Sequence, residues 1–274
     1  MDPAPPSPAA APQNEPLVII IEGEIGGGKT VIARAVAEEL EGRGLATCLI
    51  LEPVDLWHST GALQLFYQDP ARYAGQFQSF VFATRTMAIL EAFEQRRGSA
   101  DVFVLERSPA TDPIFMELQR GSISPIEMGM YTAWCDCWRR MLPLKLEGAR
   151  VIYLKTSLDV CMARIAQRRR DGETAGATAD GETADDKKSA PGVSVEYQAR
   201  LRRAHEAFLQ GRHAGEFPLM PISPFDRSLV LEVGPELADG NFRDEGAERT
   251  RIVSTIVDRL RLPGCATAPT ARGT

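Results

Sequence analysis

The sequence contains no run of about 18 uninterrupted apolar residues, the length that a membrane-spanning helix requires. It also lacks a basic N-terminus followed by an apolar segment, so it carries no secretory signal. Residues 1–15 contain no Lys or Arg, whereas mitochondrial presequences are rich in Arg. We therefore expect an intracellular protein, in the cytoplasm or nucleus, that does not associate with membranes.

Excess positive charge is also missing. The chain has 31 Lys and Arg against 37 Asp and Glu, a net charge of −6, which disfavours a nucleic-acid-binding protein. Cysteine is scarce and odd in number, with five residues, so reduced thiols are expected. Cys135 and Cys137 lack the second ligand pair that a zinc site requires. These absences favour an enzyme or module that binds small molecules.

Three segments have too few large apolar side chains to form part of a buried core. Residues 1–15 and 263–274 are rich in Pro and Ala, and residues 171–192 repeat the pentamer Asp-Gly-Glu-Thr-Ala. We predict disordered tails at both ends and a mobile insertion in the middle. The remaining chain, 16–262, has the size of a single domain.

Short continuous apolar runs alternate with helical patterns along this domain. The predicted strands are 16–21, 45–51, 101–105, 150–154 and 228–233, and the clearest helices are 29–41, 71–96 and 194–210. On 71–96 we predict an apolar stripe formed by Phe77, Phe80, Thr84, Ala88 and Glu91. Continuous rather than alternating apolar strands indicate burial on both faces. The pattern predicts an α/β fold with a five-stranded parallel sheet flanked by helices.

A glycine-rich motif follows the first predicted strand and precedes the first helix. It runs Gly23-Glu24-Ile25-Gly26-Gly27-Gly28-Lys29-Thr30, the G-x-x-x-x-G-K-[ST] pattern of a phosphate-binding loop. Gly23, Gly26, Gly27 and Gly28 allow the backbone to turn its N–H groups toward phosphate oxygens. Lys29 is expected to reach the β- and γ-phosphates, and the Thr30 hydroxyl to ligate Mg²⁺.

Carboxylates follow the next two strands. Glu52 ends the second strand, and Glu106 ends the third and is followed by Arg107. Parallel strands end at one edge of the sheet, so we expect Glu106 to hold the metal, Glu52 to act as base and Arg107 to orient it. A carboxylate at the acceptor position repels a phosphate dianion, which favours a neutral alcohol as acceptor. The sequence has no guanine-reading Asn-Lys-x-Asp and no protein-kinase motifs.

Several motifs occur in an order that resembles the deoxyribonucleoside kinase family. They are GEIGGGKT, EPVDLW, LFYQDPARYAGQFQSF, ERS and RIAQRRRDGE. The resemblance covers about residues 16–260 and points to the deoxycytidine kinase, deoxyguanosine kinase and insect multisubstrate members. Herpesvirus-type thymidine kinases typically have Asp-Arg-His where this chain has Glu106-Arg107-Ser108.

The resemblance implies transfer of the ATP γ-phosphate to the 5′-hydroxyl of a deoxynucleoside, in nucleotide salvage. It implies that Glu52 is the base and that Tyr67 binds the 3′-hydroxyl. It also implies a nucleoside pocket lined by Trp57, Leu63, Phe66, Phe77, Gln78 and Met116. Independently of the family, Gln78, Val81 and Arg85 share one helix face. For Phe77 and Val81, plain core packing is the alternative.

The preferred base is left open. In the family, polar residues at the positions of Arg85 and Asp112 go with deoxycytidine and deoxypurines, whereas Val81 matches thymidine-accepting members. Asp112 also precedes Pro113, which is the pattern of a helix N-cap. If its carboxylate caps the helix, its contact with the base weakens.

The family closes an Arg-rich lid over the donor phosphates. Arg164, Arg168 and Arg170 match it, with Glu173 as the candidate for the 3′-hydroxyl and Glu182 as a second choice. Family members are usually homodimers, and Trp134 and Trp138 belong to the core or the dimer interface. We predict a kinase that favours deoxycytidine and deoxypurines. The alternatives are a thymidine-preferring kinase, a non-catalytic nucleotide-binding module and a nucleic-acid-associated ATPase.

Overall fold

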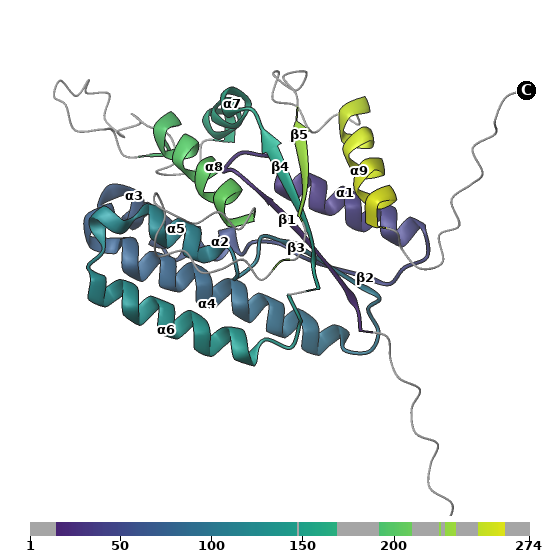
Figure 1. Cartoon of the computed structure of the whole chain (residues 1–274), viewed down its shortest axis with the longest axis horizontal. Helices are drawn as coiled ribbons and strands as arrows, with labels where there is room; N and C mark the ends of the chain where they lie inside the picture. The colour runs from purple at the N-terminus through teal and green to yellow at the C-terminus, as the bar shows by residue number, and fades with distance from the viewer. Residues whose placement is uncertain are drawn as a thin grey trace, which may run out of the picture.

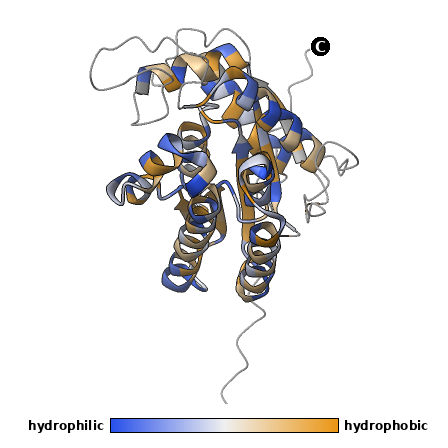
Figure 2. Ribbon diagram, turned by 90° about the vertical axis from the view of Figure 1, so that its left-hand side faces the viewer, coloured by the Kyte–Doolittle hydropathy of each residue, from blue (hydrophilic) through white to orange (hydrophobic). Residues whose placement is uncertain are grey.

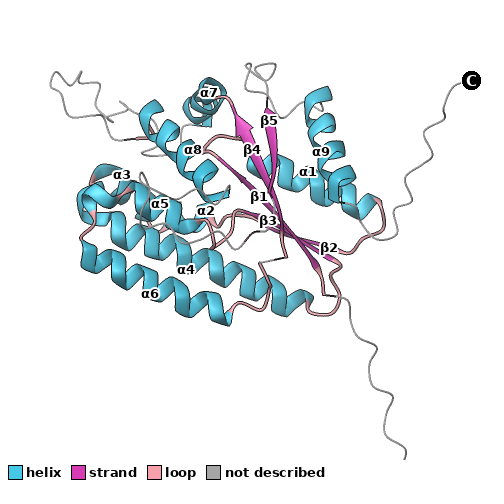
Figure 3. Ribbon diagram, viewed as in Figure 1, coloured by secondary structure: helices cyan, strands magenta, loops and turns pink. Residues whose placement is uncertain are grey.

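A parallel sheet lies at the centre of the protein in its computed structural model, which describes residues 15–146, 148–168, 192–209, 225, 228–233 and 246–260 (Figures 1 and 3). The sheet has five strands in the order β2-β3-β1-β4-β5. The strands are β1 (Leu17–Gly23), β2 (Thr47–Ile50), β3 (Val102–Glu106), β4 (Arg150–Thr156) and β5 (Ser228–Val233). The predicted strands and the α/β class are therefore confirmed.

The register of the strands brings their carboxyl ends to one edge. Ile21 of β1 lies opposite Glu106 of β3, and Gly23 lies opposite Leu154 of β4. Ile50, the last residue of β2, pairs with Leu105. The phosphate loop after β1, Glu52 after β2 and Glu106 at the end of β3 consequently meet at the same edge, where α/β proteins bind ligands.

Helices cover both faces of the sheet (Figure 1). Helices α1 (Lys29–Gly42) and α9 (Ala247–Leu260) pack on one face, against Ile19 and Ile21. On the other face, α4 (Pro70–Arg96), α5 (Asp112–Leu118) and α8 (Val195–Leu209) pack near Val18 and Ile20. Figure 2 shows the strands mostly in the hydrophobic colour, whereas the helices carry both colours. Burial on both faces explains the continuous apolar runs.

The remaining helices surround this core. Helix α3 (Ala62–Gln68), a short 3₁₀ helix (Arg120–Ser122) and α6 (Pro125–Met141) pack against α4, and α2 (Val54–Ser59) packs against α3. Helix α7 (Leu158–Arg168) follows β4 and packs against α8 (Figure 1). Ser124 and Glu127 form a capping box at the start of α6, each side chain accepting the other's backbone N–H. The side chain of Asp69 accepts the N–H of Arg72 at the start of α4.

The apolar stripe predicted for α4 is wrong in part. Phe77 is buried, but Glu91 is exposed, and Phe80, Thr84 and Ala88 are only partly buried. The buried residues are Ala74, Phe77, Gln78, Val81, Phe82, Arg85, Thr86 and Ile89. The buried face includes two polar residues, Gln78 and Arg85, and Arg85 pairs with the carboxylates of Glu52 and Asp112. Apolarity alone therefore mislocates the buried face.

The predicted tails and the insertion lie outside the described residues, except Gly192 and Glu15, whose carboxylate pairs with Lys145. In the part of the chain that the structure describes, no helix combines the length and the apolarity needed to cross a membrane.

Candidate active site

The glycine-rich loop connects the buried strand β1 to helix α1. Gly26 has φ 80° and Gly28 has φ 89°, backbone conformations that side-chain-bearing residues rarely adopt. A Cβ on Gly26 would lie 2.5 Å from the carbonyl oxygen of Cys161. Both the backbone angle and the close approach of α7 therefore require glycine, as the motif predicts.

Side chains bind the carbonyl oxygens of this loop one after another. Lys29 Nζ donates to the oxygen of Glu24 (2.9 Å), and Gln198 Nε2 to that of Ile25 (2.5 Å). Arg164 Nη1 donates to Gly26 (3.3 Å), and Thr156 Oγ1 to Gly27 (2.9 Å). Because these carbonyl oxygens have partners, they need not turn toward a bound phosphate, which they would repel. The loop is thus preorganised for an anion.

Lys29 is buried beneath the loop. Its burial, and then the positive charge of Arg107, lower its pKa to about 8, against the raising influence of Glu52, Glu106 and Glu22. The ammonium group remains mostly charged at neutral pH. It is therefore available to a phosphate oxygen.

Thr30 and Glu106 form a pair of oxygen ligands beside the loop. The Thr30 hydroxyl donates to Glu106 Oε1 at 2.8 Å. Burial of Glu106, and then the negative charge of Glu52, raise the pKa of its carboxyl group. A hydroxyl and a carboxylate are hard oxygen donors of the kind Mg²⁺ prefers, and a cation here would relieve the repulsion between the two carboxylates. The residues present therefore fit this metal.

Glu52 lies between two buried arginines. Arg85 Nη2 is 2.5 Å from its Oε1, and Arg107 Nε is 3.3 Å from the same oxygen. Burial of Glu52 acts to raise its pKa, but Arg107, Arg85 and Lys29 outweigh it and hold the pKa at about 2. Glu52 is therefore ionised at neutral pH, at the edge where an acceptor would meet the phosphate loop.

Arg107 has an unusual backbone. Its φ of 63° is the only positive value for a non-glycine residue in the described chain. Its side chain reaches Glu52 on one side and Glu22 Oε2 (3.4 Å) and His205 Nε2 (3.3 Å) on the other, and stacks over Phe115. Glu106 and Arg107 are adjacent in sequence yet face different partners. Backbone strain of this kind clusters at functional sites.

The residues predicted to line the nucleoside pocket form one cluster. Trp57, Leu63, Phe66, Tyr67, Phe77, Val81 and Met116 are all buried in it. Phe66 stacks on Phe77 with ring centroids 4.7 Å apart, and Trp57 meets Phe77 edge-on at 6.3 Å. The Trp57 indole donates to Thr84 Oγ1 at 2.9 Å, which fixes its ring. Arg85 lies over Trp57, so the cluster adjoins the Glu52 site.

Gln78, Val81 and Arg85 share the inward face of α4, as predicted, with exposures of 4%, 6% and 3%. Asp112 pairs with Arg85 at its other end. Of the two readings left open for Asp112, the helix cap does not apply: Asp112 is the first residue of α5, Thr111 precedes it, and no side chain caps this end. The Thr111 hydroxyl binds Glu22 instead (2.6 Å), and the carboxylate of Asp112 serves Arg85.

Comparison with known proteins agrees with this site. The family model described as "Deoxynucleoside kinase" matches residues 19–179. The chain belongs to the deoxynucleoside kinase family. As a member, it has the P-loop NTPase fold and is an ATP-dependent phosphotransferase that acts on deoxynucleosides.

Curated relatives of this deoxynucleoside kinase match over most of their length. The probable deoxycytidine kinase of fowlpox virus is 28% identical over 88% of this chain and 86% of its own. The thymidine kinase of Ictalurid herpesvirus 1 is 28% identical over 71% of this chain and 75% of its own. The deoxycytidine kinase of Bos taurus is 28% identical over 76% and 81%. Relatives with different bases in their names match at the same identity of 28%, so identity does not resolve base preference.

The lid of the kinase is described only in part. Arg164 is buried and donates to the loop at Gly26, so it lies next to the phosphate site. Arg168 is the last residue of α7, four positions further on. Arg170 and Glu173, as well as the alternative Glu182, lie outside the described residues.

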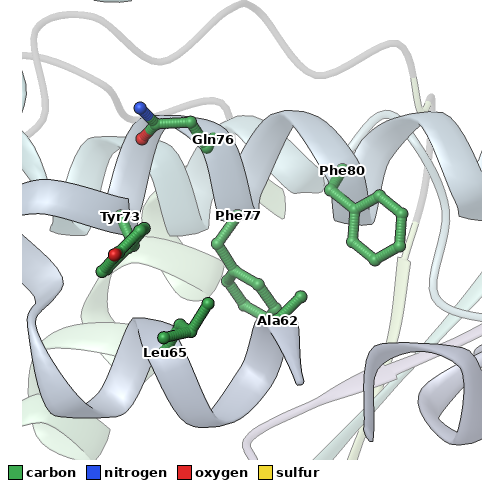
Figure 4. Close-up of a pocket in the computed structure, with 6 residues that line it drawn as sticks. All are labelled: Ala62, Leu65, Tyr73, Gln76, Phe77 and Phe80. Carbon is green, nitrogen blue, oxygen red and sulfur yellow. The ribbon is translucent and has the colours of Figure 1, made fainter. Parts of the chain in front are cut away.

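A hollow of about 180 Å³ opens between α3 and α4 of the kinase (Figure 4). It is lined by Ala62, Leu65, Tyr73, Gln76, Phe77 and Phe80. Tyr73, Gln76 and Phe80 occupy a different face of α4 from Gln78, Val81 and Arg85. The hollow therefore lies on a different side of α4 from the Glu52 site, although Phe77 also belongs to the aromatic cluster beside that site.

Sequence reasoning missed a buried polar network behind the kinase site. Its members are Glu22, Glu24, Thr111, Tyr153, Gln198, Arg202 and His205. The available signal was Glu22, a charged residue in an otherwise apolar buried strand, which requires a partner. Gln198, Arg202 and His205 also follow one another on one face of α8, beside its apolar stripe.

Proposed function

We propose that this deoxynucleoside kinase transfers the γ-phosphate of ATP to the 5′-hydroxyl, with Glu52 as the proton acceptor. The 5′-oxygen bonds to the γ-phosphorus, the bond to the β–γ bridging oxygen breaks, and the hydroxyl proton passes to the Glu52 carboxylate. The observation that carries this proposal is the position of the two carboxylates at one sheet edge. Glu106 is hydrogen-bonded to Thr30 of the phosphate loop, whereas Glu52 lies between Arg85 and Arg107. Their different partners support different roles.

Each remaining group of the site has a proposed role. Lys29 and Arg164, together with Arg168 and Arg170, bind the donor phosphates. Thr30 and Glu106 would hold Mg²⁺, which supplies charge neutralisation on the phosphates when bound. Arg107 orients Glu52 and the acceptor. Glu173 is proposed to bind the 3′-hydroxyl together with Tyr67.

We further propose that bases with an exocyclic amino group, as in deoxycytidine and the deoxypurines, are preferred over thymine. Two observations support this. Asp112 is free of a capping role, and its carboxylate accepts hydrogen bonds, which an amino group donates. Gln78 is almost fully buried on the same face of α4 as Arg85, the partner of Asp112. The competing proposal, a thymidine-preferring kinase, rests on Val81 and gains weight from the herpesvirus relative.

The decisive test is phosphorylation of deoxycytidine, deoxyadenosine, deoxyguanosine and thymidine by ATP and Mg²⁺. Glu52→Gln should lower kcat by about 10²- to 10⁴-fold and leave the Kd for ATP unchanged. Glu91→Gln, on the exposed side of α4, is the matched control and should behave as wild type. Full turnover by Glu52→Gln would exclude Glu52 as the base. Binding of ATP without turnover of any acceptor would favour the non-catalytic nucleotide-binding module.

We also propose that the kinase is a homodimer that pairs through α6. Ile126, Met130, Trp134 and Met141 of α6 are 77%, 69%, 47% and 53% exposed, and Met87 of the adjoining α4 is 43% exposed (Figure 1). A contiguous apolar stripe of this kind marks an interaction surface. Sedimentation should give a dimer for the wild type and a monomer for Met130→Glu. A monomeric wild type at micromolar concentration would contradict the proposal.

A further inference from the structure

Helix α8 presents a polar face to the site although none of its residues is expected to touch a substrate. Gln198, Arg202 and His205 follow one another at intervals of four and three residues, so they lie on one face. Gln198 and His205 have no exposed surface, and the Arg202 side chain is 20% exposed. Burying an amide, a guanidinium and an imidazole is costly without partners, so their contacts indicate their role.

Two of these side chains bind the phosphate loop, residues 23–30, which is proposed to hold the donor phosphates and is called the donor loop below. Gln198 Nε2 donates to the carbonyl oxygen of Ile25 at 2.5 Å. Arg202 Nε donates to Glu24 Oε1 at 2.6 Å, and its Nη2 donates to the carbonyl oxygen of Thr156. The Thr156 hydroxyl in turn holds Gly27 at 2.9 Å. Arg202 therefore fixes the loop at two points, one direct and one through β4.

The Arg202 contact also balances charge. Glu24 lies within the phosphate-binding motif and has no exposed surface. Its Oε1 accepts from Arg202 and from the Tyr153 hydroxyl (2.8 Å), whereas its Oε2 finds no hydrogen-bond partner among the described residues. Without Arg202, a buried carboxylate would stand in the loop that has to accept the triphosphate. Like charges would then oppose ATP binding.

The third side chain, His205, contacts Arg107, the arginine that holds the proposed base Glu52. His205 Nδ1 lies 2.9 Å from the carbonyl oxygen of Leu201, so this nitrogen donates and carries the proton. Its Nε2 lies 3.3 Å from Arg107 Nη1 and 3.7 Å from Glu22 Oε2, and in the neutral imidazole it accepts from Arg107. Arg107 contacts Glu52 with its Nε. His205 thus sets the position of the arginine that holds the proposed base.

Tyr153 connects the residues that hold the donor loop with those that hold the acceptor base. Its ring stacks on His205 with centroids 5.7 Å apart, and its hydroxyl binds Glu24. We infer that α8 is a positioning element that keeps the donor loop and the acceptor base in register, Arg202 acting through Glu24 and His205 acting through Arg107. This inference rests on the proposed roles of the loop and of Glu52.

The test separates the two halves of the site. Arg202→Met should raise both the KM and the Kd for ATP about 10- to 100-fold and leave the KM for deoxycytidine within about twofold. His205→Leu should lower kcat about 10- to 100-fold and leave the Kd for ATP within about twofold. His205→Gln offers an oxygen that can accept from Arg107, so it should recover much of the lost kcat. The Kd for ATP and Mg²⁺ is measured by calorimetry without acceptor.

Arg200→Met is the matched control, because Arg200 is exposed on the same helix. It should leave every constant as in the wild type. The inference is overturned if Arg202→Met and His205→Leu change the same constants alike, or if they lower only the melting temperature. A wild type without turnover would instead refute the proposed function. In that case, an unchanged Kd for ATP in Arg202→Met would still overturn the donor half of the inference.

Discussion

Replacement of Arg85 by Met should destabilise the protein far more than the loss of any exposed arginine. Arg85 is 3% exposed and pairs with Glu52 and with Asp112, which is 1% exposed. Glu52 keeps Arg107, but Asp112 is left as a buried carboxylate without its cation. Removing one partner of a buried ion pair costs about 3–5 kcal/mol. In a domain of this size, that is a fall of roughly 6–20 °C in melting temperature.

The assay is urea unfolding of the wild type, Arg85→Met, Asp112→Asn and the double variant. Asp112→Asn removes the stranded charge, so the double variant should regain at least about 2 kcal/mol relative to Arg85→Met. Arg96→Met, exposed in the last turn of the same helix, is the control and should cost no more than about 1 kcal/mol. Equal losses for Arg85→Met and Arg96→Met, or no coupling between positions 85 and 112, would refute the reasoning.

Three further predictions follow from the same contacts. Gly26→Ala places a Cβ against the carbonyl oxygen of Cys161 at a residue with positive φ. It should weaken ATP binding by about 5- to 150-fold in a calorimetric titration. An unchanged affinity would show that the loop can relax. Thr111→Val removes the hydroxyl that donates to Glu22 and should cost about 1–3 kcal/mol in urea unfolding, whereas Thr111→Ser should cost less. The pKa of Glu52 and that of Glu22 are lowered in the folded protein, so the stability that they contribute is complete above about pH 4.5 and is lost as the pH falls below it. The midpoint of urea unfolding should therefore fall between pH 7 and pH 3, and it should fall less in Glu52→Gln.

The parts of the site that sequence reasoning located are those encoded locally. The phosphate loop is a contiguous motif between a strand and a helix, and Glu52 and Glu106 follow directly from where buried strands end. Parallel pairing then places all three at one edge, so no knowledge of distant contacts is needed. The inward face of α4 required one further step, because its polar residues face the site and its apolar pattern misleads.

The network behind the site could not be predicted in the same way. Glu24 and Arg202 are 178 residues apart, and Arg107 and His205 are 98 residues apart. Nothing in the local sequence of α8 states which strand end it will cover. The role of Asp112 likewise depends on tertiary contact: the local pattern allowed a helix cap as readily as a pocket residue, whereas in the structure the carboxylate pairs with the buried Arg85. Long-range charge pairing decided both cases.

The central place of β1 in the sheet has a consequence for how the chain folds during synthesis. Leu17 of β1 pairs with Val102 of β3, some 85 residues later, and the other neighbour, β4, emerges later still. At a synthesis rate of 5–20 residues per second, this strand waits roughly 4–17 s for its first partner. During that interval a strand of consecutive Ile residues has no sheet to join, so chaperone capture or aggregation competes with folding. The strand that carries the phosphate loop is thus also the strand of the sheet that waits longest for its first partner during synthesis.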